Sequence, residues 1–179
     1  MSSPRAFESL GGETVFHGRI FDVRAERFRH ADGEEVTREI VRHAGAVAML
    51  AFDEHDVWLV RQPRESVGEA DLLEIPAGRL DRHGEEPLAA AKRELAEEIG
   101  RRAELWEPIV TYYTGAGFTD ERVHLFAATG LSEEHADSGE QERIEVVRWP
   151  LRDLDGALAE CQDAKTLIAL YWLARRLNG

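Results

Sequence analysis

A continuous apolar run, AVAMLAF at residues 46–52, most narrows the folds that this chain can adopt. Seven apolar residues without polar alternation are typical of a strand that is buried on both faces. The polar stretch DEHD follows as a turn and leads into VWLVRQ, which has the pattern of a second strand. The run therefore predicts a strand in the interior of a sheet.

The order of the other predicted elements favours a fold class. TVFHGRIFDVRAERFRH and EEVTREIVRH flank Asp32-Gly33, a dipeptide that predicts a hairpin turn. Further strands are expected at 72–75, 104–113, 122–128 and 144–149, and Asp163 is placed to cap a last helix, AKTLIALYWLARRL. Strands, a helix, strands and helices in this order favour an α+β sandwich over alternating βαβ units.

The composition and net charge of the chain restrict the number of domains and the classes of molecule that it can bind. With 179 residues, 43% of them hydrophobic, the chain is expected to form one domain with a real core. A net charge of −13 argues against nucleic acid, and it means that a phosphorylated ligand needs cations between itself and the protein. Cys161 is alone and is expected to be a small buried residue. No signal peptide or membrane-length apolar run is visible, which predicts a cytoplasmic protein.

A helix is predicted between Pro87, which suits a first helical turn, and Gly100, which suits a left-handed stop. Its apolar residues recur at steps of three and four and define the expected buried stripe, namely Leu88, Ala91, Leu95 and Ile99.

Three carboxylates, Glu94, Glu97 and Glu98, crowd one side of this helix. Glu94 and Glu98 are four residues apart, and such a like-charge pair costs an isolated helix ~0.2–0.5 kcal/mol. One interpretation is a solvated face neutralised by neighbouring basic residues, although Arg101 and Arg102 lie beyond the helix stop. The other is that the three acids share hard divalent cations, with Mg²⁺ the natural choice because it also coordinates phosphates.

Residues 78–100, GRLDRHGEEPLAAAKRELAEEIG, resemble the signature box of the Nudix hydrolases. Gly78 opens the box, Glu85 is its first acid, and the segment from Arg93 to Gly100 matches in order. Two departures are visible: six residues rather than five separate Gly78 from Glu85, and Arg101 stands where an aliphatic residue is usual. The extra residue falls before the helix, so the helical acids keep their mutual spacing.

The resemblance implies a Nudix-type α/β/α sandwich with a mixed central sheet and an N-terminal extension of antiparallel strands. It also implies water attack on a phosphorus of a nucleoside diphosphate linked to another group. The metal ligands, for Mg²⁺ or Mn²⁺ as a substitute, would be Glu94, Glu97, Glu98 and the carbonyl of Ala77. Arg93 would orient the acid helix by pairing with Glu85 or a neighbouring carboxylate.

Beyond the box, HAGAVAML, VWLVRQPR, LLEIPAG, GFTDERVHLFAATGL and DAKTLIALYWL resemble the ADP-ribose pyrophosphatase branch. The products would be AMP and ribose 5-phosphate. The resemblance assigns substrate contacts to Arg38, Arg64, Phe21, Gly117 and Glu121. The arginines are equally compatible with exposed ion pairs, and Phe21 with a plain core residue.

One loop departs from the branch pattern. Gly115 and Ala116 stand where the branch has Ser-Pro, which leaves open a broader preference for nucleoside diphosphate sugars. A comparison of ADP-ribose, ADP-glucose and GDP-mannose turnover separates the two preferences.

The resembling enzymes are homodimers that exchange N-terminal strands. Here residues 13–43 would form the dimer strands and 44–179 the catalytic core of a single domain spanning 1–179, with Arg38 and Phe21 serving the partner's pocket. Two rival classes are a non-catalytic nucleotide sensor, which typically loses the box acids retained here, and an acidic adaptor supported by charge alone.

In the resembling enzymes the general base is a glutamate on a loop well after the box, which implies the acidic loop HADSGEQERIEVV at 135–147 here, with Glu142 as first choice and Glu140 as second. Glu142→Gln is predicted to lower turnover by ~10²–10⁴, the usual contribution of general base catalysis. Steady-state kinetics check this, and unchanged turnover would move the role to Glu140 or elsewhere.

Overall fold

The computed structural model describes residues 6–134 and 143–179, and the chain divides into two compact units. The strand unit comprises the chain up to Gly45 together with Tyr113–Arg122. The sandwich unit comprises Ala46–Tyr112 and Val123–Gly179. The single domain expected over 1–179 stays a prediction.

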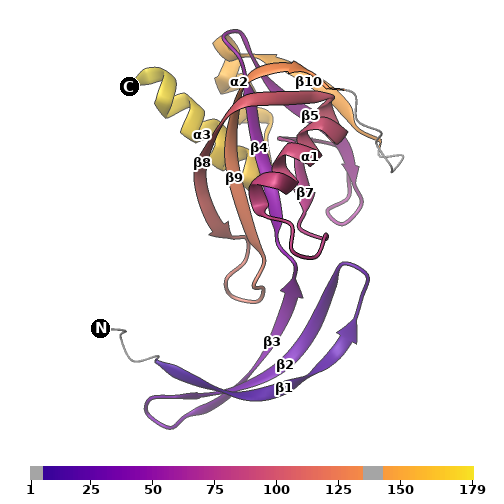
Figure 1. Ribbon diagram of the computed structural model, residues 1–179. Helices are drawn as coiled ribbons and strands as arrows, with labels where there is room; N and C mark the ends of the chain where they lie inside the picture. Colours follow the sequence, from indigo (N-terminus) through magenta and orange to yellow (C-terminus); the bar gives the residue numbers. More distant parts are fainter. Residues whose placement is uncertain (1–5, 135–142) are drawn as a thin grey trace. The chain divides into compact units, whose positions relative to one another are not determined.

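The strand unit is built on an antiparallel sheet of order β1-β2-β3 (Figure 1). Its strands are β1 (Phe7–His17), β2 (Phe21–His30) and β3 (Glu35–His43). The predicted hairpin at Asp32-Gly33 is confirmed, because the turn joins β2 to β3 and Gly33 has a φ of 91°.

The N-terminal strands begin earlier than the predicted residue 13, since β1 already begins at Phe7. Its SLGG stretch has the composition of a turn, yet the register with β2 continues across it through a bulge between Ser9 and Gly11. A Cβ on Gly12 would lie 2.1 Å from the carbonyl oxygen of Ala25, so the glycine is required by close approach of the two strands.

Within the described strands β1–β3, Glu26 is the one buried residue. Its carboxylate accepts hydrogen bonds from Arg24 (2.9 Å) and Arg42 (2.7 Å), and Arg42 also donates to Asp120 (2.8 Å). The hydrogen bond from Arg42 is the main cause that holds the pKa of Glu26 below its usual value. The sheet therefore encloses a paired charge instead of an apolar core.

The sandwich unit is built on a mixed sheet with the path β10-β5-β4-β9-β8. β4 runs parallel to β9 and antiparallel to β5, while β6 pairs with β5 and β7 with β4. The strands are β4 (Ala46–Phe52), β5 (Asp56–Arg64), β6 (Glu69–Glu74), β7 (Ala77–Arg79), β8 (Arg101–Tyr113), β9 (Arg122–Glu133) and β10 (Glu145–Pro150).

Among the described residues, three helices accompany the sheet, with a short 3₁₀ turn at Leu151–Asp153 before the second. They are α1 (Pro87–Ile99), α2 (Leu154–Glu160) and α3 (Ala164–Asn178). α2 has seven residues, too few for the sequence to show a helical period. The described part of the chain contains no helix long and apolar enough to cross a membrane.

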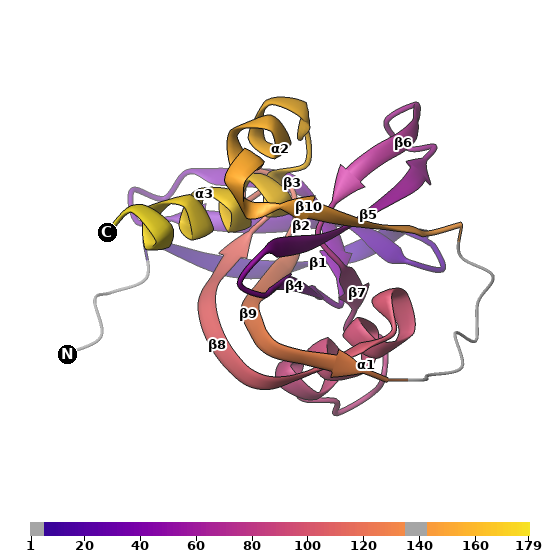
Figure 2. The same cartoon turned by 90° about the horizontal axis from the view of Figure 1, so that it is seen from above.

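The central strand β4 is buried on both faces, as its sequence predicts. Ala48 and Leu50 pack in a core with residues of α2 and α3, whereas Val47, Met49 and Ala51 pack in a second core with α1. Figures 1 and 2 show α1 on one side of the sheet and α2 and α3 on the other. The predicted α/β/α sandwich, with a mixed sheet and antiparallel N-terminal strands, is confirmed.

The helix that carries the acids has the predicted ends. Pro87 opens α1, and Gly100 ends it in the left-handed conformation with a φ of 62°. Ala91, Leu95 and Ile99 are buried as expected, but the prediction for Leu88 is wrong because it is 37% exposed. Ala90, which the predicted stripe does not include, is buried instead, although it lies about 200° around the helix from Leu88.

The last helix, α3, is hydrogen-bonded to the segment that leads into the box. Asp163 caps it as predicted and accepts a hydrogen bond from the Thr166 amide at 2.9 Å. The buried Thr166 hydroxyl accepts from the amide of Ile75 at 2.8 Å. Cys161, which precedes the cap, is buried as expected.

Candidate active site

Arg93 gathers the acids of the box around its guanidinium group. Nε and Nη2 donate to the two carboxylate oxygens of Glu85 at 3.1 and 2.9 Å. Nη1 donates to Glu94 at 2.6 Å and to Glu97 at 2.9 Å. Only an arginine supplies this planar fork of donors. The predicted pairing of Arg93 is therefore present, with Glu85 and two neighbouring carboxylates together.

The backbone of β7 lies against the acid face of α1. The amide of Ala77 donates to Glu98 Oε2 at 3.1 Å. A Cβ built on Gly78 would fall 2.0 Å from Cδ of Glu94, so the Glu94 carboxylate occupies the space that any other side chain would take. Two of the three helical acids thus meet the Ala77–Gly78 backbone, and the glycine that opens the box is required by this approach.

The acids of the cluster differ in electrostatic setting. The hydrogen bonds from Arg93 lower the pKa of Glu85. Burial raises the pKa of Glu94, and the nearby charge of Glu97 adds to this, although Arg93 opposes both. The same carboxylates, Glu85 first, raise the pKa of Arg93, which stays fully charged.

Carboxylate and backbone oxygens are the donors that a hard divalent cation prefers, so the residues here fit Mg²⁺ or Mn²⁺ in kind. Within residues 6–134 and 143–179, no three His, Cys, Asp or Glu side chains are already arranged to hold a metal ion. The reason lies in the contacts above: Arg93 holds Glu94 and Glu97, and the Ala77 amide holds Glu98. The roles of Glu94, Glu97, Glu98 and the Ala77 carbonyl as ligands stay predictions.

The departures from the box pattern have local explanations. Arg101 lies with its guanidinium 4.6 Å from the ring centroid of Trp58, which is 7% exposed, so a stacked planar group covers the ring where an aliphatic side chain is usual. The extra residue falls in the loop before α1, where Gly84 has a φ of 77° and His83 is exposed.

Arg64, a predicted substrate residue, belongs to the same sandwich unit. Its Nε and Nη2 donate to Glu74 at 2.6 and 2.8 Å, and Glu74 also pairs with Lys165. Sequence reasoning missed Glu74 and Lys165. Lys165 carried a signal, because a cation in the first turn of a helix opposes the helix dipole.

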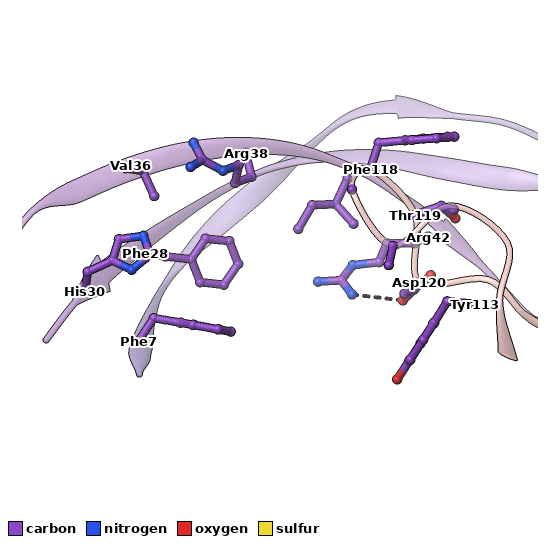
Figure 3. A pocket seen from close by; sticks show the side chains of 13 residues that line it. Phe7, Phe28, His30, Val36, Arg38, Arg42, Tyr113, Phe118, Thr119 and Asp120 are labelled. Carbon is purple, nitrogen blue, oxygen red and sulfur yellow. Dashed lines mark hydrogen bonds and ion pairs between the residues drawn. The ribbon is translucent and has the colours of Figure 1, made fainter. Parts of the chain in front are cut away.

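A pocket of about 430 Å³ lies in the strand unit (Figure 3). It contains the predicted substrate residues Arg38 and Gly117, whereas Phe21 and Glu121 are not among its lining residues. Aromatic and aliphatic side chains form much of the wall, beside two arginines. The lining comprises Phe7, Phe28, His30, Val36, Arg38, Ile40, Arg42, Tyr113, Ala116, Gly117, Phe118, Thr119 and Asp120.

The two remaining predicted substrate residues have different surroundings. Phe21 is 40% exposed and lies 6.1 Å from the Phe16 ring, so its interpretation as a core residue is wrong. Glu121 accepts a hydrogen bond from the Thr114 hydroxyl at 2.6 Å and pairs with His43 at 3.3 Å.

The loop between Tyr113 and Arg122 is hydrogen-bonded. The carbonyl of Gly115 accepts from the amides of Phe118 and Thr119, both at 2.9 Å, and Phe118 O accepts from the Val41 amide at 2.8 Å. A Cβ on Gly115 would lie 2.7 Å from the Phe118 ring, so the glycine found in place of the usual serine suits this turn. The predicted bases Glu142 and Glu140 lie outside the described residues.

Comparisons with known proteins agree with this fold and this box. The model of the NUDIX domain matches residues 41–171. The ADP-ribose pyrophosphatase of Bacillus subtilis (strain 168) is 40% identical, covering 93% of this chain and 91% of that protein. The ADP-ribose pyrophosphatase of Mycobacterium tuberculosis is 44% identical, covering 71% of this chain and 61% of that protein.

Among solved structures, that of an ADP compounds hydrolase superimposes with a TM-score of 0.85 at 24% identity, covering 100% of this chain and 98% of that one, and it supports the fold. The chain belongs to the NUDIX family. The resemblance drawn from the box is confirmed, as is the resemblance to the ADP-ribose pyrophosphatase branch.

Gly78→Ala is predicted to push the Glu94 carboxylate away from β7, because the added Cβ has no space. The affinity for Mn²⁺, measured by calorimetry, is expected to fall ~10–100-fold, as when a group that orients metal ligands is lost.

Gly68→Ala is the control for this substitution. Gly68 has a φ of 75° in an exposed turn, so alanine strains the backbone there but meets no atom within 4 Å. The free energy of unfolding should fall, and the affinity for Mn²⁺ should stay unchanged. Equal Mn²⁺ affinities for Gly78→Ala and wild type would contradict the prediction.

Proposed function

We propose that the protein hydrolyses the diphosphate bond of ADP-ribose to AMP and ribose 5-phosphate. The observation that carries the proposal is the acid cluster: Glu85, Glu94 and Glu97 meet on Arg93, and Glu98 meets the Ala77 backbone. Membership of the NUDIX family supports the reaction class, and the two relatives named as ADP-ribose pyrophosphatases support the substrate.

The proposed metal ligands are Glu94, Glu97, Glu98 and the carbonyl of Ala77, with Mg²⁺ as the ion and Mn²⁺ as a substitute. Such an ion, when bound, neutralises the diphosphate and lowers the pKa of water. A chain with a net charge of −13 needs this neutralisation to admit an anionic substrate.

The protein's own residues have separate proposed tasks. Arg93 holds three carboxylates, those of Glu85, Glu94 and Glu97, in one arrangement, and its positive charge offsets their mutual repulsion. Arg64 would bind a phosphate, and it is already oriented because two of its nitrogens donate to Glu74. Glu142, or failing that Glu140, is the proposed general base. The cytoplasmic location stays a prediction.

The pocket of the strand unit supports Arg38 and Gly117 as substrate contacts. An aromatic and aliphatic wall with an arginine suits a flat heterocycle, since a guanidinium plane stacks on such rings. Figure 3 shows Phe7 and Phe28 near Arg38 on the wall of the pocket. Phe21 and Glu121 remain proposed contacts, and a broader action on nucleoside diphosphate sugars remains the alternative.

Incubation with ADP-ribose and Mg²⁺, followed by chromatography, is expected to yield AMP. Chelation with EDTA should abolish the activity, and Glu98→Gln should lower it on the order of 100-fold through loss of a ligand charge. Glutamine can still accept the bond from the Ala77 amide, so the fold is kept. ADP-glucose and GDP-mannose, run in parallel, measure how narrow the preference is.

Glu107→Gln is the matched control, because Glu107 is an exposed acid of β8 that pairs with Arg176. It should retain full activity. Normal turnover in EDTA or in Glu98→Gln would rule out the metal-dependent reaction, and ADP-ribose binding without AMP would favour the nucleotide sensor.

We also propose that the protein is a homodimer assembled through its strand unit. The described strands β1–β3 bury Glu26 alone, whereas several apolar side chains of the unit lie exposed. Val15, Phe16 and Ile20 are 53–56% exposed, a set that a second copy could cover.

Light scattering is expected to give twice the 20.2 kDa mass of one chain. Phe16→Ser should shift the protein towards the monomer by removing apolar contact area. Leu105→Ser, at an exposed position of β8, should leave the mass unchanged. A fully active wild-type monomer would remove the dimer from the proposal.

A further inference from the structure

Glu74 is a buried carboxylate at the end of β6, with 1% of its surface exposed. Its Oε1 accepts from Nε of Arg64, and its Oε2 accepts from Nη2 of Arg64 and from the ammonium group of Lys165. A buried charge is tolerated only when it is paired. One arginine that donates to both oxygens is enough to pair one carboxylate, yet Glu74 has two cationic partners. The second partner, Lys165, therefore needs another explanation.

Lys165 lies in the first turn of α3, where the helix dipole disfavours a cation. It pairs there with Asp163, the residue that caps the helix, at 3.0 Å. A lysine at this position therefore destabilises the helix itself. Its ion pair with Glu74, which lies outside the helix, is the contact that the helix does not explain.

The same helical turn also fixes the backbone beside Glu74. The Thr166 hydroxyl accepts from the amide of Ile75 and donates to Asp163, at 2.8 and 2.6 Å. Ile75 leads through Pro76 into Ala77, whose amide donates to Glu98. The first turn of α3 therefore holds both the side chain that anchors Arg64 and the backbone that meets the acid helix.

The side chains of Arg64 and Lys165 differ in how much of their surface is exposed to solvent. The Arg64 side chain is 39% exposed, so part of its guanidinium can meet a ligand, while the Lys165 side chain is 15% exposed and faces the two carboxylates. With Lys165 present, the cluster of Arg64, Lys165, Glu74 and Asp163 is formally neutral. Without Lys165 it carries one net negative charge, which opposes the approach of a phosphate.

We propose that Lys165 is a positioning residue for phosphate binding: it shares the Glu74 carboxylate with Arg64, which fixes the guanidinium and keeps its charge available to the substrate diphosphate. This inference rests on the proposed function. Burial alone would raise the pKa of Glu74, but the bonds and charges of Arg64 and Lys165 lower it, so the carboxylate remains an anion at neutral pH.

Lys165→Met keeps the length of the side chain and removes its charge. The KM for ADP-ribose is expected to rise about tenfold, as for one lost charge-assisted interaction, with kcat changed less than about threefold. The split is expected because the phosphate charge that Arg64 meets is present in both the ground state and the transition state. Lys165→Arg restores the charge and should bring KM back to within about threefold of wild type.

Arg175→Met is the matched control, because it removes one positive charge from an exposed position of the same helix. It should leave KM and kcat unchanged. If Lys165→Met does not fold, the double variant Glu74→Gln with Lys165→Met removes the buried charge together with its partner. A rise in KM is expected there too, because glutamine offers Arg64 a single neutral acceptor oxygen in place of the two carboxylate oxygens.

A second readout does not depend on activity. The NMR signal of the Arg64 Nε–H, assigned by its loss in Arg64→Lys, should be sharp in wild type and broadened in Lys165→Met. A sharp signal and an unchanged KM in Lys165→Met, even with a lower melting temperature, would reduce Lys165 to a structural role and overturn the proposal. Absence of ADP-ribose turnover in wild type would instead overturn the proposed function, and the signal would still test the positioning.

Discussion

The ion pairs of Arg93 are the interaction on which the acid helix depends. Glu94 and Glu97 lie on one side of α1, and Glu85 approaches from the preceding loop, so three like charges converge on one place. One guanidinium meets all three, because its donors spread in a plane that a lysine cannot reproduce. The helix can therefore present acids to β7, while Ala91, Leu95 and Ile99 are buried in the core with Val47 and Met49 of β4.

The same solution recurs at the two carboxylates, Glu26 and Glu74, that are buried within residues 6–134 and 143–179. Glu26 in the strand unit is paired by Arg24 and Arg42, and Glu74 in the sandwich unit by Arg64 and Lys165. A chain with 35 acidic and 22 basic residues has few cations to spare, so their placement beside buried acids is informative. Each pairing restricts an arginine that also leaves part of its side chain exposed, which is how a binding group is kept in one orientation.

Local patterns predicted much of this architecture. The apolar run of β4, the Pro87 and Gly100 ends of α1 and the Asp163 cap of α3 each depend on a few neighbouring residues, and all three are confirmed. The failures have non-local causes. β1 is a strand across its glycines because β2 pairs with it, and Leu88 is exposed in the first turn of α1 whereas Ala90 is buried, a difference set by what packs against that turn.

The candidate site divides in the same way. Spacing within one helix predicted which acids share a side, since helical geometry determines that without any partner. The contacts between Glu74 and Lys165, 91 residues apart, could not be read from spacing because they depend on how α3 packs beside β6. The stacking of Arg101 on Trp58 is hidden in the sequence for the same reason.

The arrangement of the box also depends on α3, which lies outside the box in the sequence. The glycine and the acids of the box lie within residues 78–100. The segment that leads into the box is nevertheless held by the hydroxyl of Thr166 and the charge of Lys165. Both come from one helical turn whose cap, Asp163, bonds to each of them. Leu170 and Leu173 pack the same helix into the core with Leu50 and Leu59, so the hydrophobic energy of that face is what keeps the turn in place. The chemistry of the box thus draws on apolar packing some 70 residues further along the chain, through a hydrogen bond and an ion pair that are each too short-ranged to act unless that packing is intact.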